Sequence, residues 1–80
     1  MNDTQIHEHI ENLIAEEHRL FEHGDNGKLS EDDRARLEEI SVRLDQYWDL
    51  LRQRRARRDA GQDPEVAHLR TGEVVEHYQQ

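Results

Sequence analysis

Residues 37–51 read LEEISVRLDQYWDLL, and their apolar side chains recur every three or four positions. The recurring residues are Leu37, Ile40, Leu44, Tyr47 and Leu51. This spacing is that of one face of an α-helix, because a half-buried strand would alternate at every second residue. Neither proline nor glycine interrupts the segment between Ser30, which suits a helix N-cap, and Gly61. We therefore predict a helix over about residues 30–60.

A second apolar pattern of the same spacing lies nearer the N-terminus. Its members are Ile6, Ile10, Leu13, Leu20 and Phe21. Glu17 occupies a position where the pattern calls for an apolar residue. Asp3 or Thr4 is suited to cap the start of a helix and Gly24 to end it. These signals predict a helix over about residues 4–23.

The segment between the two patterns, GDNGK at residues 24–28, favours a short turn that reverses the chain. The two helices are therefore expected to lie antiparallel, with a seam of the coiled-coil type between them. The pairs expected to face each other are Leu20 with Leu37, Leu13 with Leu44, and Ile6 with Leu51. With Ile10 and Ile40, these residues form the predicted core.

The last twenty residues carry weaker signals. Asp63 followed by Pro64 is typical of a helix start and predicts a helical turn through about His68. Residues 73–78, EVVEHY, fit either a helical face or a strand, and we favour a helix. The predicted fold class is all-α, with an antiparallel helical hairpin over residues 1–60 and a short, partly helical tail over 61–80.

Each predicted helix has an apolar face wider than one partner helix can cover. Ile14, Phe21 and Trp48 lie one position beyond the seam. Leaving a tryptophan and a phenylalanine wet forfeits about 1.5–3 kcal/mol for each side chain. A second copy of the hairpin, closing a four-helix bundle, is the simplest cover. We therefore expect a homodimer whose interface includes these three residues.

Five arginines lie within little more than one and a half turns of the second predicted helix. They are Arg52, Arg54, Arg55, Arg57 and Arg58. Such a tract could bind phosphate groups, which would make the protein a nucleic-acid or ribonucleoprotein accessory factor. The structural alternative is that the arginines complement the helix dipole and pair with Asp3, Glu8 and Glu11 of the first helix. We favour the structural alternative, because the formal net charge of −8 opposes general nucleic-acid binding.

The composition offers little for catalysis or metal binding. The chain has no cysteine, and its serines have better explanations as an N-cap and a helix surface position. Glu17 in the apolar pattern could pair with Arg43, and the Glu65-x-x-His68 spacing is too common to indicate a metal site. We therefore expect no enzyme activity, metal or cofactor. The absence of a signal peptide or a membrane-spanning apolar run leads us to expect a cytoplasmic protein with no membrane partner.

Four stretches together resemble a family of short actinobacterial proteins of unknown function. They are EEHRL at residues 16–20, LDQYWDLLRQRR at 44–55, Asp63-Pro64, and EVVEHY at 73–78. The resemblance covers nearly the whole chain, and the tyrosine–tryptophan stretch that runs into arginines is its most specific part. It implies an actinobacterial source and no particular activity. Our functional expectation is therefore a small non-enzymatic protein–protein interaction module.

Overall fold

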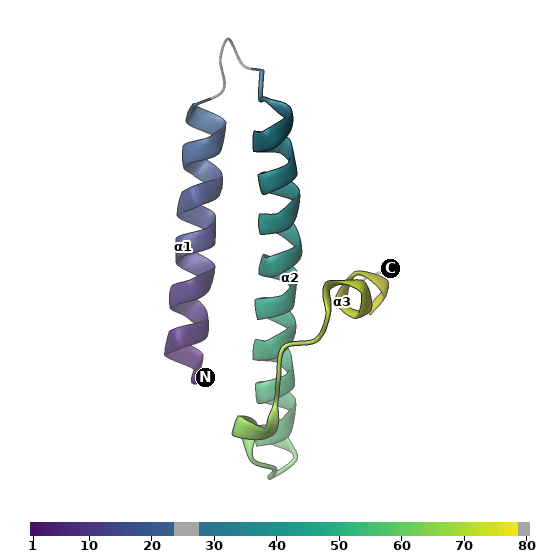
Figure 1. The fold of residues 1–80 in the computed structure, drawn as a ribbon. Helices are drawn as coiled ribbons and strands as arrows, with labels where there is room; N and C mark the ends of the chain where they lie inside the picture. Colours follow the sequence, from purple (N-terminus) through teal and green to yellow (C-terminus); the bar gives the residue numbers. More distant parts are fainter. Residues whose placement is uncertain (24–27, 79–80) are drawn as a thin grey trace.

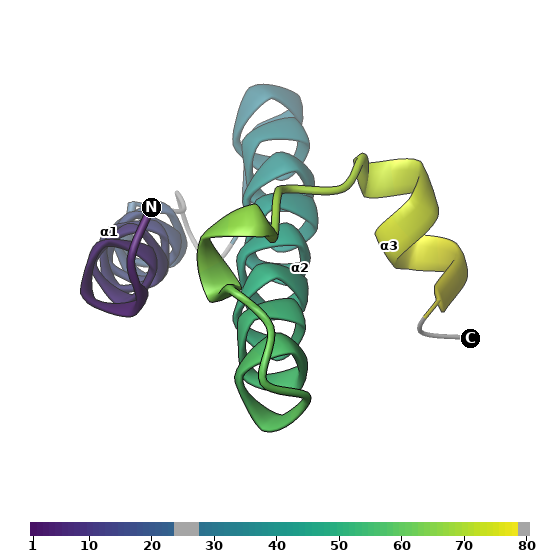
Figure 2. The same ribbon diagram turned by 90° about the horizontal axis from the view of Figure 1, so that it is seen from below.

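The computed structural model describes residues 1–23 and 28–78, and in these ranges the chain is all-α (Figure 1). The segments are α1 (Asp3–Glu22), α2 (Glu31–Asp59), the 3-10 turn η1 (Pro64–Val66) and α3 (Gly72–Tyr78). α1 and α2 lie side by side and antiparallel, which confirms the predicted hairpin (Figure 1). Viewed along the helices, α2 lies between α1 and α3 (Figure 2).

The two long helices begin and end within one residue of the predicted bounds. The cap of α1 differs from the prediction, because Asn2 and not Asp3 or Thr4 precedes the first turn. Its side-chain oxygen accepts a hydrogen bond from the Gln5 backbone at 2.8 Å, and Gln5 bonds back to the Asn2 backbone. Ser30 caps α2 as predicted, accepting from the Asp33 backbone at 3.1 Å. Residues 24–27 of the predicted turn at 24–28, Gly24 among them, lie outside the described residues.

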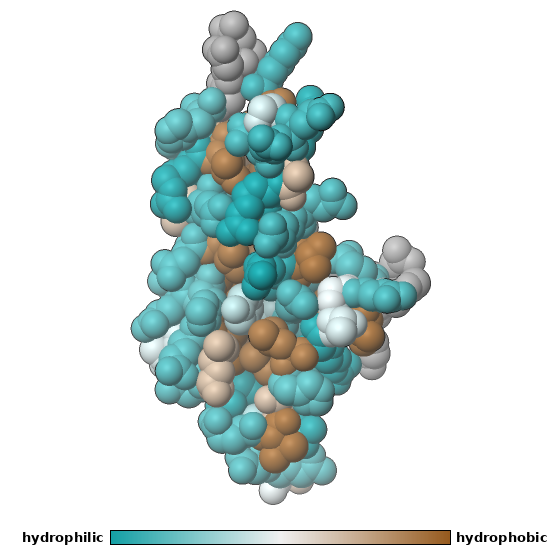
Figure 3. Space-filling model, in the orientation of Figure 1, coloured by the Kyte–Doolittle hydropathy of each residue, from teal (hydrophilic) through white to brown (hydrophobic). Residues whose placement is uncertain are grey.

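The core lies between α1 and α2, and fewer of the predicted core residues are fully buried than we expected. Ile6, Ile10 and Ile40 are buried, whereas the five leucines of the expected seam are only half-buried. Tyr47 and Leu50 form one buried cluster with Ile6 and Ile10, and Ala67 of the tail packs against it. On the face seen in Figure 3, hydrophobic residues gather along the middle of the hairpin and beside α3, with hydrophilic side chains outside them.

The tail folds back along α2, and its last helix is the one favoured from the sequence. η1 ends at Val66, slightly before the predicted end of that turn at His68. Val75 of α3 is only 1% exposed. Gly72 lies so close to α2 that a Cβ atom there would be 2.6 Å from Val42 Cγ1. The absence of a side chain at residue 72 therefore permits the close contact of α3 with α2.

None of the helices in the described parts of the chain is both long and apolar enough to cross a membrane.

Candidate interaction surface

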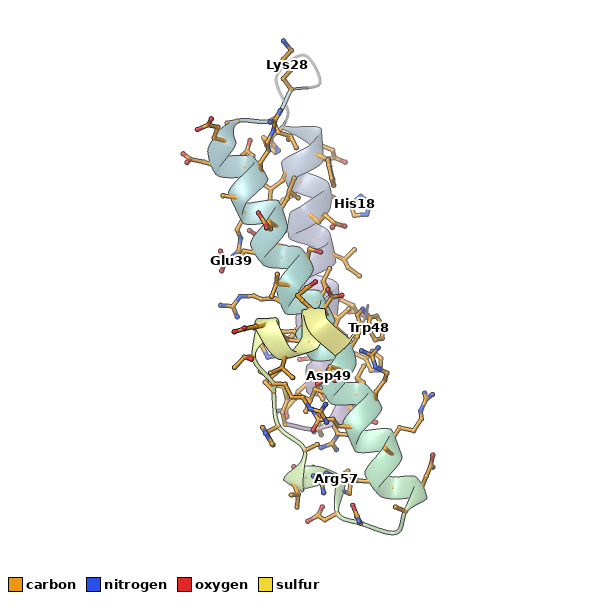
Figure 4. All side chains as sticks on the ribbon, turned by 90° about the vertical axis from the view of Figure 1, so that its right-hand side faces the viewer. His18, Lys28, Glu39, Trp48, Asp49 and Arg57 are labelled. Atoms are coloured by element: carbon orange, nitrogen blue, oxygen red, sulfur yellow. The ribbon has the colours of Figure 1, made fainter. Side chains whose placement is uncertain are left out.

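One side of the hairpin carries large apolar side chains that the chain itself leaves exposed. Ile14 is 38% exposed, Trp48 42% and Phe21 60%. The structure thus places all three predicted interface residues at the surface. In Figure 4, Trp48 of α2 and His18 of α1 lie along one edge of the hairpin, and Glu39 lies along the opposite edge. Ile14 and Phe21 are one helical turn before and after His18, so they share this edge.

Half-buried leucines of α2 continue this surface toward the core. Leu44 lies one turn before Trp48 and Leu51 one turn after it, and Leu37 is a heptad before Leu44. We call these six residues the apolar stripe. Its members are Ile14 and Phe21 of α1 with Leu37, Leu44, Trp48 and Leu51 of α2.

The C-terminal end of the stripe borders a hollow of about 270 Å3 between the two helices. Its lining combines basic, acidic and aromatic groups, namely Asp3, His7, Trp48, Leu51, Arg52, Arg55 and Arg58. The His7 ring meets the Trp48 ring edge-on, with centroids 6.3 Å apart and planes at 78°. The sequence pattern did not single out His7 as a partner of Trp48. The sequence did contain a signal: His7, Ile14 and Phe21 are spaced seven residues apart, so they lie on one side of the helix.

Two of the five arginines are engaged by acids of the same chain. Arg54 is 5% exposed, and its Nε donates to Asp3 Oδ1 at 2.5 Å. Its other nitrogens donate to the Pro64 carbonyl oxygen and to Glu65 Oε1, both at 3.2 Å. Arg58 reaches Asp3 Oδ2 at 2.9 Å. These contacts join the N-terminus, α2 and the tail, as the structural alternative expects of Arg54 and Arg58.

The electrostatics of this cluster follow from its geometry. Hydrogen bonds from Arg54 and Arg58 hold the pKa of the Asp3 carboxyl below its usual range. The hydrogen bond that Arg54 donates to Asp3, and to a smaller degree the one it donates to Glu65, raises the pKa of Arg54. Asp3 was an expected partner of the tract, but the described contacts of the tract include neither Glu8 nor Glu11. Glu65 was not foreseen, because its position depends on the return of the tail along α2.

The other three arginines differ from this pair. Arg57 donates to Gln62 Oε1 at 3.5 Å, a weak contact. Arg52 and Arg55 are exposed and make no ion pair with any residue that the structure describes. The five predicted phosphate-binding residues are therefore not equivalent. Arg52 and Arg55 remain available to contact a partner.

A second hollow, of about 340 Å3, lies on the other side of the hairpin. There Arg36 binds both carboxylate oxygens of Glu16, at 2.5 and 2.6 Å, and this contact lowers the pKa of Glu16. The predicted pairing of Glu17 with Arg43 is wrong, because Arg43 contacts Glu39 of its own helix. The Glu17 side chain is half-buried. Within residues 1–23 and 28–78, no three histidine or acidic groups cluster to hold a metal ion.

Comparison with known proteins places the chain in a family. A model of a family described as proteins of unknown function, DUF2630, matches residues 2–80. Uncharacterised proteins of Mycobacterium bovis and Mycobacterium tuberculosis are 44% identical over 77 residues, which cover 95% of this chain and 88% of each relative. No solved structure matches the chain significantly. The chain therefore belongs to the DUF2630 family, which confirms the resemblance seen in its sequence.

Proposed function

We propose that this protein is a non-enzymatic interaction module, two copies of which join through the apolar stripe to close a four-helix bundle. The observation that carries the proposal is the exposure of Ile14, Phe21 and Trp48, which helical spacing assigns to one edge of the hairpin. Scattered apolar residues are normal on a protein surface, but large exposed apolar side chains that gather on one side of two helices are typical of an interaction site.

A second copy suits this surface for two reasons. The stripe includes residues of both helices, so a second hairpin presents a surface of the same length and the same chemistry. Two-fold symmetric contacts use one patch twice, and they are the commonest mode of association in soluble oligomers. A chain of 80 residues also has a small core of its own, so burial of further apolar area contributes a large share of its stability.

Sedimentation equilibrium at micromolar concentration tests the proposal. We expect about twice the chain mass for the native sequence and a shift toward the monomer for Trp48→Glu, because the substitution buries an unpaired charge. Leu69→Glu is the matched control: Leu69 is 43% exposed, close to the value for Trp48, but lies in the tail. A native protein that stays monomeric at high micromolar concentration, or equal effects of the two substitutions, would contradict the proposal.

A second candidate function is phosphate binding at the hollow beside Trp48. Arg52 and Arg55 favour it, because neither has an acidic partner among the described residues, and Trp48 offers a ring on which a base could stack. A nucleic-acid accessory factor of this kind would bind RNA with an affinity that falls steeply with salt. Binding of total RNA by the native protein, lost in an Arg52→Gln, Arg55→Gln double variant that keeps the dimer, would favour this candidate.

A further inference from the structure

We infer that the hollow beside Trp48 binds a nucleoside phosphate, with the base stacked on the Trp48 ring and the phosphate groups held by Arg52 and Arg55. The inference rests on the second candidate function, phosphate binding at the same hollow, and it names the class of ligand. The proposed dimer is not needed for it.

The residues that would hold the ligand follow one another along α2. Arg52 is four residues after Trp48, and Arg55 is seven residues after it, so the three side chains share one side of the helix. All three line the hollow of about 270 Å3. At 1.5 Å per residue, Arg52 lies about 6 Å and Arg55 about 10 Å beyond Trp48 along the helix axis. The sugar of a nucleotide separates its base from its phosphate groups, so a base on Trp48 can direct the phosphates toward these arginines.

Arg52 and Arg55 can bind phosphate without first breaking an ion pair within the described parts of the chain. Both are exposed, and neither makes an ion pair within residues 1–23 and 28–78. Arg58, the third arginine of the hollow, is already held by Asp3 Oδ2 at 2.9 Å. A guanidinium group presents a planar fork of donors that matches the oxygens of a phosphate. Two such groups one helical turn apart suit a ligand with one or two phosphates.

The aromatic part of the hollow distinguishes a nucleoside phosphate from inorganic phosphate. Trp48 is 42% exposed. His7 lies at 78° to it, with ring centroids 6.3 Å apart, so the two rings are not stacked on each other. A partly exposed indole ring beside cationic side chains is a typical platform for a base, because every base has an aromatic face.

The charges around the hollow favour a small ligand over a long strand. Its lining has three arginines against one aspartate, Asp3. Along α1 and α2, the other acids within one turn of a lining residue do not line the hollow; they are Glu8, Glu11, Asp45, Asp49 and Asp59. A nucleic-acid strand that left the hollow would meet this acidic surface, in a chain of formal net charge −8, and would be repelled. A single nucleotide contacts the basic hollow alone.

Fluorescence of Trp48, the single tryptophan of the chain, tests the inference with ADP as the ligand. Because Trp48 also belongs to the apolar stripe, the titration is made at a protein concentration at which sedimentation gives the single-chain mass. We expect ADP to quench the emission. Adenosine and pyrophosphate should each bind at least about tenfold more weakly, because each lacks one of the two contacts.

Variants measured by equilibrium dialysis with ADP separate the two contacts. Trp48→Phe keeps an aromatic ring and should bind nearly as well as the native protein, whereas Trp48→Leu should weaken binding about tenfold or more. The Arg52→Gln, Arg55→Gln double variant should lose as much, for ADP and for pyrophosphate. Arg57→Gln is the matched control, since Arg57 lies in the same tract but lines a different hollow.

The outcomes separate the inference from the second candidate function. Equal affinities for ADP and pyrophosphate, with unchanged Trp48 emission, would leave phosphate binding in place and overturn the stacked base. Absence of binding by both ligands would overturn the second candidate function as well. A single-stranded oligoadenylate that binds far more tightly than ADP, with a steep dependence on salt, would overturn the preference for a free nucleotide and identify RNA as the source of the bound unit. Equal losses in the double variant and in Arg57→Gln would contradict the assignment of Arg52 and Arg55.

Discussion

The two flanks of α2 are covered in different ways. On the tail flank, Gln46 donates to the Arg70 carbonyl oxygen at 3.0 Å, and Gln53 donates to that of His68 at 2.8 Å. Asp49 is buried under the tail, with Arg70 Nε at 3.6 Å. The flank that carries the apolar stripe presents large apolar side chains instead, among them the half-buried Leu44 and Leu51 and the exposed Trp48. A short polar tail can therefore cover the first flank, whereas the apolar side chains of the second suit another apolar surface.

The largest effect should follow from a charge placed beneath the tail. Val75→Asp puts a carboxylate at a fully buried position, at a cost of at least about 3 kcal/mol if α3 stays in place. We expect α3 to leave α2 while the hairpin stays folded, with fast amide exchange confined to the tail. Val74→Asp is the control, because Val74 is 46% exposed and its change should stay within about 0.5 kcal/mol. Equal exchange in the two variants would contradict the packing of α3.

The neighbouring residues Arg54 and Arg55 should contribute differently to the stability of the fold. Arg54→Gln removes three donated hydrogen bonds at a buried position and should lower the free energy of unfolding by about 1–3 kcal/mol. Arg55→Gln, on the exposed side of the same helix, should change it by no more than about 0.5 kcal/mol. Urea unfolding of both variants at one protein concentration measures the difference. A larger loss for Arg55 would reverse the structural assignment of the tract.

A smaller effect is expected where α3 approaches α2. Gly72→Ala places a methyl group 2.6 Å from Val42 Cγ1, and the overpacking should cost about 1 kcal/mol after the gain in helix propensity. Val42→Ala makes room for the new methyl group, so it should cost less in the Gly72→Ala background than alone. Additive effects of the two substitutions would show that these residues do not compete for space.

The hairpin could be predicted from sequence because its signals are local. Two apolar patterns with helical spacing and the N-cap at Ser30 located both helices to within one residue. The exposure of Trp48 and Phe21 followed from the same spacing, since it placed them beyond a single seam. These predictions depend only on residues within a few turns of each other.

The contacts of the tail could not be predicted, because they join residues far apart in the chain. Glu65 reaches Arg54, and Asp49 is buried, only because the chain turns back at Gly61, whose φ is +71°. The contacts of buried Arg54 similarly include Asp3, near the N-terminus, and the Pro64 carbonyl oxygen, in the tail. Within the arginine tract, Arg54 and Arg55 differ only in the side of the helix on which they lie. The sequence does not show which side the tail follows.

The pH response should also differ between the hairpin and the tail. The pKa of Glu16 is lowered by its hydrogen bonds from Arg36, so this contact stabilises the hairpin at neutral pH and is lost as pH falls through the lowered pKa. At the tail, hydrogen bonding with Asp45 raises the pKa of Glu76. That contact is fully present below the ordinary carboxyl pKa of about 4.3 and is lost as pH rises through the raised value.

The smallest predicted effect comes from Glu76. We expect α3 to pack more firmly on α2 when the Glu76 side chain is neutral. Glu76→Gln keeps a donor for Asp45 without a second negative charge, so at pH 7 we expect slower amide exchange in α3 and a melting temperature higher by a few degrees at most. Glu73→Gln makes the same charge change on the same helix and is the control. Since the native contact is already present when Glu76 is protonated, the gain from Glu76→Gln should shrink toward pH 4. A gain of equal size at both pH values, or one shared by the control, would show that net charge and not the Asp45–Glu76 contact governs the docking of α3.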